Sequence, residues 1–260
     1  MKMPALQNLM RRVAWLGFFG LILSAWWLMF RMNGAMGLDV LGSSPVNFLD
    51  LCLSPAKGAQ FWIIYGMWGL MMAAMMGPTF VPTARSYEDM ISARAATRTG
   101  FIGLITGYLL IWLGFAAFFA LAQMFLQSQA LLDGLGASSS GGLSVILLVI
   151  AGLYQFSAAK DACLNKCQSP MVFFLGNWKN GALGGVLMGA KLGVYCLGCC
   201  WAMMSLGFIG GVMNLVWMGI ATLIMTLEKL PDVGRRITRP LGGVFLLAAL
   251  LVGANNFGAF

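Results

Sequence analysis

The sequence predicts an all-α fold, a polytopic membrane helical bundle with about seven transmembrane helices. Composition is the first reason: 60% of the 260 residues are hydrophobic and 9% are charged, whereas soluble domains carry about 25% charged residues. The second reason is the length of the apolar runs, several of which reach the roughly 20 residues that cross a bilayer. The third is that Lys and Arg gather in the short segments between those runs, as in loops on the inner side of a membrane.

The expected helices follow one another in a single domain, residues 1–260, without an internal repeat or a separate soluble region. The first apolar run is too long for the hydrophobic part of a signal peptide, and no small-residue cleavage site follows it, so we expect a retained helix. The alternation of basic loops predicts an N-terminus inside and a C-terminus outside. The predicted spans are 12–30, 60–81, 100–126, 143–162, 182–204, 209–229 and 241–258.

The formal net charge of +8 does not indicate a nucleic-acid partner, because the cations are divided among the loops and do not form one patch. The expected partner is the lipid bilayer. The chain has no histidine, no Gly-rich phosphate loop and no zinc motif, so hydrolytic chemistry is not expected and an enzyme is the less favoured class. A proton-coupled transporter would carry more carboxylates inside its helices.

The fifth expected helix carries glycines at four-residue intervals, followed by a stripe of sulfur-bearing side chains. Small residues let a neighbouring helix approach closely, and this packing drives helix association in lipid. The sulfurs follow at i, i+3, i+4 and i+7, so they share one helical face. That face continues the glycine ridge into the bundle, in the outer half of the membrane. The residues are Gly181, Gly185, Gly189 and Gly193, then Cys196, Cys199, Cys200 and Met203.

Thiolate and thioether ligands select soft metal ions, above all Cu(I), with zinc also possible for the thiolates. The sulfur stripe therefore predicts a buried metal site. The alternative is that cysteine serves there only as a small residue in tight helix packing. Methionines on neighbouring helices supply further candidate donors or, alternatively, fill gaps in the core. These are Met67, Met71 and Met75 on one stripe of the second expected helix, with Met72 and Met76 beside it, and Met218 on the sixth.

Three polar residues within the expected helices are further candidates for a functional role. Lys191 falls near the middle of the fifth helix, where it would pair with a carboxylate such as Glu228 or Asp161, or hold a nearby thiolate. Snorkelling to the interface is the alternative. Asn214 would form a hydrogen bond between helices. Glu228 and Lys229 would reach the inner interface, in a salt bridge with each other or with a loop residue.

Cys163 and Cys167 lie four residues apart at the end of the fourth expected helix. This spacing suits a shared metal ion or a reversible dithiol. Both residues fall on the predicted inner side, where a reducing cytoplasm argues against a structural disulfide. Cys52, in the loop before the second helix, receives no role.

A series of motifs runs through residues 60 to 255. It consists of Trp68, Met71, Ala74–Met75–Met76 and Pro78; Tyr154–Gln155, Lys160, Cys163, Cys167 and Pro170; Trp178 and Gly181; Tyr195–Cys196, Gly198–Cys199–Cys200–Trp201 and Met204; Gly211–Val212–Met213–Asn214 and Trp217–Met218; and Glu228–Lys229. In this series the chain resembles the predicted metal-binding integral membrane proteins known as domain of unknown function 2182. The resemblance implies metal binding in a bacterial inner membrane. The chain departs from the family pattern at Gln168, where a basic residue is frequent, and in having no histidine before Tyr195.

Three classes of function remain open from the sequence. The leading hypothesis is a multi-pass inner-membrane protein that transports Cu(I), or holds it for delivery to a membrane or periplasmic cuproenzyme. The second is a thiol-redox protein in which the cysteines of the fifth helix relay electrons across the membrane to Cys163 and Cys167. The third is an accessory structural subunit that docks a larger membrane enzyme complex through the glycine ridge and aromatic residues.

Overall fold

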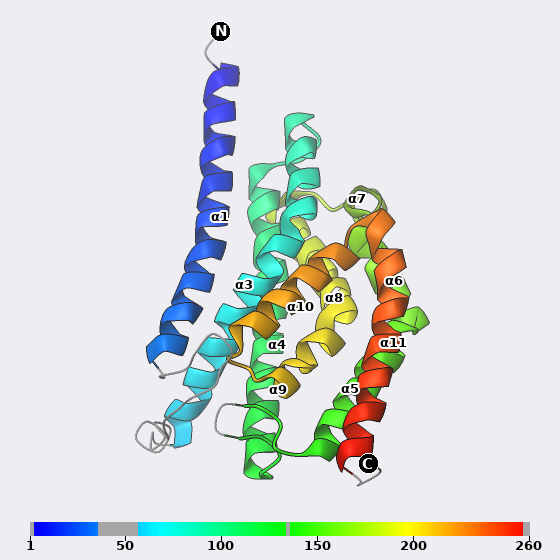
Figure 1. Ribbon diagram of the computed structural model, residues 1–260. Coiled ribbons are helices and arrows are strands. Elements are labelled where there is room, and N and C mark those ends of the chain that lie inside the picture. Colours follow the sequence, from blue (N-terminus) through cyan, green and yellow to red (C-terminus); the bar gives the residue numbers. More distant parts are fainter. Residues whose placement is uncertain (1–2, 36–56, 134–135, 257–260) are drawn as a thin grey trace.

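The protein is a bundle of α-helices, described for residues 3–35, 57–133 and 136–256 of a computed structural model (Figure 1). The described residues form no β-strand beyond an isolated bridge between Leu132 and Ser138, so the predicted all-α membrane bundle is confirmed. The helices are α1 (Met3–Ala35), α3 (Lys57–Ser92), α4 (Arg98–Ser128), α5 (Gly141–Gln155), α6 (Ala158–Gln168), α7 (Pro170–Asn177), α8 (Gly181–Ser205), α9 (Gly207–Gly210), α10 (Leu215–Glu228) and α11 (Pro231–Asn256).

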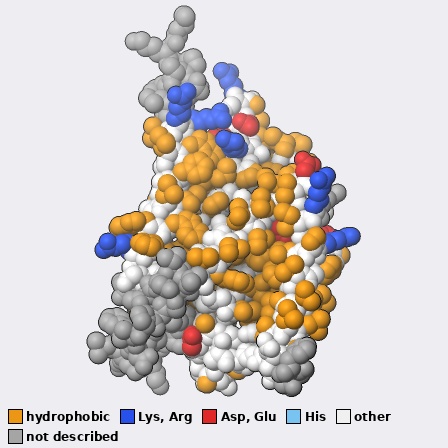
Figure 2. All heavy atoms as spheres, viewed as in Figure 1, with side chains coloured by type: hydrophobic (Ala, Val, Ile, Leu, Met, Phe, Trp, Pro, Cys, Tyr) orange, Lys and Arg blue, Asp and Glu red, His pale blue; other side chains and the backbone are white. Residues whose placement is uncertain are grey.

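Five helical stretches are long and apolar enough to cross a membrane, and a sixth span results if the bent pair α5 and α6 is taken as one. These features fit a membrane protein. Large hydrophobic side chains cover much of the face in Figure 2, as expected for contact with lipid. The start of α1 and the end of α11 lie at opposite ends of the bundle (Figure 1). Which end faces the cytoplasm stays a prediction.

Two of the seven predicted spans are not single long helices in the structure, and α1, α3 and α11 each extend about ten residues beyond one predicted end. The fourth is broken after Gln155, and α5 and α6 meet at 64°. Ser157 begins the new helix by accepting a hydrogen bond from Lys160 N at 3.1 Å, which is how a serine satisfies a free helix-end amide. The sixth is also shorter than predicted: α10 has 14 residues, or about 21 Å, against the ~30 Å of a bilayer core. Gly211, at a φ of +88°, separates α9 from α10.

The centre of the bundle is α8. The apolar span that begins with α8 is 67% buried, whereas the apolar span formed by α1 is 11% buried. The most extensive helix contact among the described residues joins α8 to α4. Glycines on both helices make this approach possible. A Cβ atom on Gly107 would overlap the carbonyl oxygen of Val186, and one on Gly189 would overlap that of Leu104. The glycine ridge therefore packs backbone against backbone, as small residues do between membrane helices.

The α4–α8 contact gives a first prediction. Replacing Gly107 by Ala should separate the two helices and lower the free energy of unfolding by about 1–3 kcal/mol, the usual effect of overpacking a core. Thermal unfolding of the purified protein in detergent measures the change.

Gly114→Ala is the matched control on the same helix, because a Cβ there meets no atom within 4 Å. The control should be neutral, or stabilising by about 0.5–1 kcal/mol through the higher helix propensity of Ala. Equal unfolding temperatures for the two variants would show that the close approach of α4 and α8 is not required.

Candidate functional site

Four cysteine side chains meet in the interior of the bundle, and we call them the thiol cluster: Cys167 of α6 with Cys196, Cys199 and Cys200 of α8. All four are free thiols and buried. The Sγ atoms of Cys199 and Cys200 are 3.3 Å apart, and the Cys199 thiol donates to the backbone oxygen of Cys196 at 3.1 Å. The Cys167 side chain lies close to those of Cys196 and Cys199. The cluster is therefore a compact set of soft donors.

The bend between α5 and α6 brings Cys167 to the other three cysteines. After the bend, α6 packs against α8. Cys163 also faces α8, and its Sγ lies so close to Gly198 that a Cβ there would be 2.6 Å away. The two cysteine groups were expected in different halves of the membrane, and the structure places them together. A continuous fourth helix would have kept them apart, so the helix break explains the difference.

Two side chains from other helices hold Cys196. The Lys229 ammonium donates to Cys196 Sγ at 2.9 Å, and the Tyr108 hydroxyl of α4 lies 3.1 Å from the same sulfur. Lys229 directly follows α10 and is 6% exposed. The prediction that Lys229 reaches the inner interface as a salt-bridge partner is wrong, because its side chain enters the bundle and ends at the thiol cluster.

Glu228 is paired with Lys160, which the sequence did not suggest. The ammonium of Lys160 donates to both carboxylate oxygens, at 2.8 and 2.9 Å, and also to Gln155 Oε1. The two charged side chains are only 1% and 2% exposed. The expected pairing of Glu228 with Lys229 or a loop residue is therefore wrong. The C-terminal end of α10 lies inside the bundle, where α6 supplies a partner.

Lys191 and Asn214 also differ from expectation. Lys191 is exposed on α8 and donates to Asn177 Oδ1 of α7 at 2.6 Å, so it pairs with neither Glu228 nor Asp161. Asn214 does not join two helices through its side chain. It caps α10 by accepting from the backbone amide of Trp217 at 2.9 Å, because the chain breaks just before that helix and leaves amides to satisfy.

The candidate methionines lie in the same buried core as the thiol cluster. The helices that carry them meet, since α10 packs against both α3 and α8. Burial is compatible with gap filling as well as with ligation, so their role as ligands stays a prediction. These methionines are Met71, Met75, Met203 and Met218.

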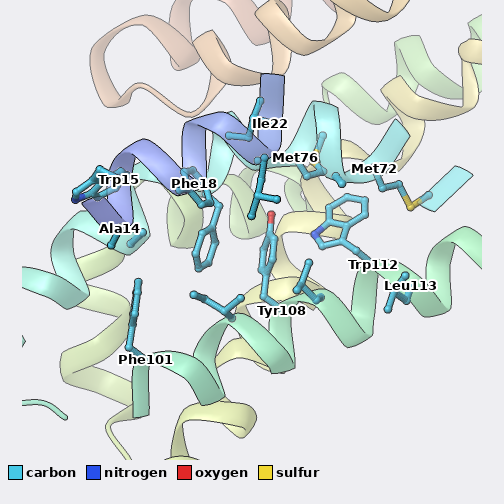
Figure 3. Close-up of a pocket in the computed structure, with 18 of the residues that line it drawn as sticks. Ala14, Trp15, Phe18, Ile22, Met72, Met76, Phe101, Tyr108, Trp112 and Leu113 are labelled. Carbon is cyan, nitrogen blue, oxygen red and sulfur yellow. The ribbon is translucent and has the colours of Figure 1, made fainter. Parts of the chain in front are cut away.

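An apolar cavity of about 690 Å³ lies between α1, α3 and α4. Figure 3 shows side chains of these helices, among them Phe18, Met76 and Trp112, around the Tyr108 side chain. Tyr108 thus separates this cavity from Cys196. Its lining offers two thioethers, Met72 and Met76, and one carboxylate, Glu88, but no thiol. We therefore place the candidate site at the thiol cluster.

A second cavity, of about 600 Å³, lies beside α6 and is lined by polar residues that include Lys166, Asp232 and Arg236. Gln168 is part of this lining and donates to the backbone oxygen of Glu228 at 2.7 Å. Its chain neighbour Cys167 is the most exposed member of the thiol cluster, at 8%. The cavity therefore lies next to Cys167 in the sequence, through its lining residue Gln168.

Within the described ranges, no three or more Cys, Asp or Glu side chains are arranged to hold a metal ion as they stand. Cys199 and Cys200 contact each other directly, and the 3.3 Å between their Sγ atoms is shorter than the ~3.8 Å between two thiolates on one tetrahedral zinc. Binding would require loss of the thiol protons and a small separation of the sulfurs. The donor set suits a soft ion, since no imidazole is present in the chain.

The fold and the site together define a helical membrane protein with a buried set of soft donors. A family model described as PpoB2, copper chaperone, matches residues 65–252. Because this match covers most of the chain, the protein belongs to that copper chaperone family. No similar protein was found among curated proteins or among solved structures. Membership in this family confirms the expectation of a copper-related protein.

Sequence reasoning missed Lys160, Tyr108 and the true position of Lys229. One signal was available: Lys160 and Lys229 both belong to the motif series, and each lies next to strongly apolar sequence or a cysteine pair. A lysine in such surroundings needs a partner at membrane depth. Tyr108 gave no signal, because an isolated aromatic residue on an apolar helix is an ordinary core residue.

The buried ion pair gives a second prediction. Glu228→Gln or Lys160→Met alone leaves one charge unpaired inside the bundle and should lower the free energy of unfolding by about 3–5 kcal/mol. The double variant Lys160→Met/Glu228→Met should recover most of this loss, because it removes both charges. Thermal unfolding in detergent measures all three.

Arg11→Gln is the control for this experiment. Arg11 lies 3.4 Å from Glu88, but its side chain is 48% exposed, and pairs in such positions contribute about 0–1 kcal/mol. Losses for the Lys160 and Glu228 variants that do not exceed this control would show that the pair does not stabilise the fold.

Proposed function

We propose that this protein is a copper chaperone of the bacterial inner membrane that binds Cu(I) at the thiol cluster and passes it to a membrane or periplasmic cuproenzyme. The observation that carries the proposal is the cluster itself, four free and buried thiols gathered between α6 and α8, two of them in direct contact. Membership in a copper chaperone family supports the identity of the metal. Copper is here the cargo of the protein.

The chemistry of the donors supports the monovalent ion. Thiolates select Cu(I), and zinc is the second choice for such ligands. Because Cys196, Cys199 and Cys200 share one helical face with Cys167 opposite, the ion can be held between α6 and α8. The cluster offers more sulfurs than a Cu(I) ion held by a pair of thiolates needs. The spare thiol lets one ligand replace another, and such exchange allows a cargo ion to move.

Two further functions remain as alternatives. A thiol-redox activity is supported by the contact between Cys199 and Cys200, but a relay across the membrane has lost its basis because Cys163 and Cys167 lie beside the other cysteines. An accessory structural subunit would use the exposed apolar helix faces and would not need the thiols. On the strength of the shared motif series, we also propose that the chain belongs to the metal-binding family known as domain of unknown function 2182.

Copper analysis of the purified protein tests the thiol cluster. The protein is loaded with Cu(I) under reducing, oxygen-free conditions, and bound copper is measured after removal of excess metal. We expect about one tightly bound ion, and at least a tenfold loss of affinity when Cys196, Cys199 and Cys200 are all replaced by Ser, since their thiolates are the proposed ligands. Cys167→Ser should weaken binding less, because three thiols remain.

Two single variants complete this experiment. Cys52→Ser is the control for replacing a cysteine by serine, because Cys52 has no assigned role. Cys52 lies outside the described residues. Cys163→Ser shows whether the sulfur beside Gly198 takes part. Equal amounts of bound copper in the wild type and the triple variant would exclude the thiol cluster as the site. Thiols that are reversibly oxidised and reduced but bind no copper would favour the redox alternative.

The methionines can be tested separately. Met→Leu keeps the size and apolar character of the side chain but removes the sulfur. If Met71, Met75, Met203 or Met218 ligates Cu(I), its Leu variant should bind copper more weakly with little change in thermal stability. Met72→Leu is the control, because Met72 lines the apolar cavity on the far side of Tyr108. Affinities equal to this control for all four variants would assign these methionines to packing alone.

A further inference from the structure

The charged side chains buried in the described part of the chain do not balance. They are Lys160, Glu228 and Lys229. Lys160 and Glu228 neutralise each other through two hydrogen bonds. Lys229 remains as one additional positive charge inside the bundle. A buried charge is strongly unfavourable unless a group of opposite charge compensates it.

The surroundings of Lys229 show which groups can compensate this charge. Its ammonium donates to Cys196 Sγ at 2.9 Å, and the Tyr108 hydroxyl lies 3.1 Å from the same sulfur. These neighbours carry no formal charge while they are protonated. A thiolate in the cluster is therefore the anion that Lys229 is positioned to meet.

We propose that Lys229 is the counter-ion of the copper-loaded thiol cluster, a positioning residue that makes two thiolates and one monovalent ion electrically neutral inside the membrane. This inference rests on the proposed function. When Cu⁺ arrives, two thiols each lose a proton and form sulfur–copper bonds, and the dithiolate complex carries a charge of −1. The ammonium beside Cys196 brings the sum to zero. No electron is transferred. The two released protons are taken up by the ligand that delivered Cu⁺ or by water.

Charge balance also gives a preference among metal ions. With two thiolates and Lys229, a monovalent ion leaves no net charge, whereas a divalent ion such as Zn²⁺ leaves +1 until a third thiol loses its proton. Coulomb interactions at this separation are strong in a medium of low dielectric constant. Lys229 thus favours Cu(I) over Zn(II) for the same pair of cysteines.

The experiment compares Cu(I) affinities by competition with a chromophoric Cu(I) chelator, together with the ultraviolet thiolate-to-copper absorption. Lys229→Met removes the charge and keeps an apolar chain of similar length. Lys229→Gln also removes the charge but keeps an N–H donor. Both should bind Cu(I) about 10–100-fold more weakly than the wild type, the range found when groups that support metal ligands are removed. Lys229→Arg keeps the charge and should retain most of the affinity.

Two controls separate charge from packing. Lys191→Met makes the same chemical change on the exposed side of α8 and should leave Cu(I) affinity unchanged. Tyr108→Phe removes the other contact to Cys196 without changing any charge, and it should affect affinity less than Lys229→Met. Zn(II) binding by Lys229→Met should fall less than Cu(I) binding, so the ratio of the two affinities should shift toward zinc.

The outcomes distinguish the inference from the proposed function. If the wild type itself binds no Cu(I), the proposed function fails. If the wild type binds Cu(I) and either neutral variant of Lys229 that remains folded binds it equally well, the counter-ion role is wrong and the proposed function stands. Thermal unfolding of the metal-free variants shows which of them are folded.

Discussion

The buried ion pair between Lys160 and Glu228 is the interaction on which the interior of this bundle depends. It ties α6 to the end of α10 at a depth where neither charge can reach water. Because α6 is held there, Cys167 faces the three cysteines of α8. Because the end of α10 is held there, the next residue, Lys229, extends its side chain to Cys196. One ion pair thus positions both the fourth thiol and the cation beside the cluster.

The second constraint is the close approach of α4 and α8. Glycines at the contact bring the two backbones together, and this places Tyr108 of α4 against Cys196. Membrane helices gain little from the hydrophobic effect between them, so close packing of this kind must supply part of the association energy. Tyr108 also lines the apolar cavity between α1, α3 and α4 (Figure 3), so its side chain lies between that cavity and Cys196.

Prediction from the sequence succeeded where the information was local. Hydropathy located the long helices, and helical spacing placed Cys196, Cys199 and Cys200 on one buried face. Prediction failed where a helix ended inside the bundle. Gln155 and Ser157 gave a weak signal for the break between α5 and α6, and the apolar run through 209–229 concealed the turn at Gly211. Each missed break moved a charged residue, Lys160 or Lys229, from an expected interface into the interior.

The sequence by itself determined that this protein is a helical membrane bundle with an excess of soft donors and no imidazole, because composition, span length and residue spacing are properties of the chain alone. Only the tertiary structure decided which sulfurs meet and which charges accompany them. Contacts between side chains of different helices depend on how the helices pack. Residues 163–167, 196–200 and 228–229 are distant in the sequence, and the bent helix pair α5–α6 and the short helix α10 bring them together. The unbalanced charge of Lys229 becomes visible only after Glu228 has found Lys160.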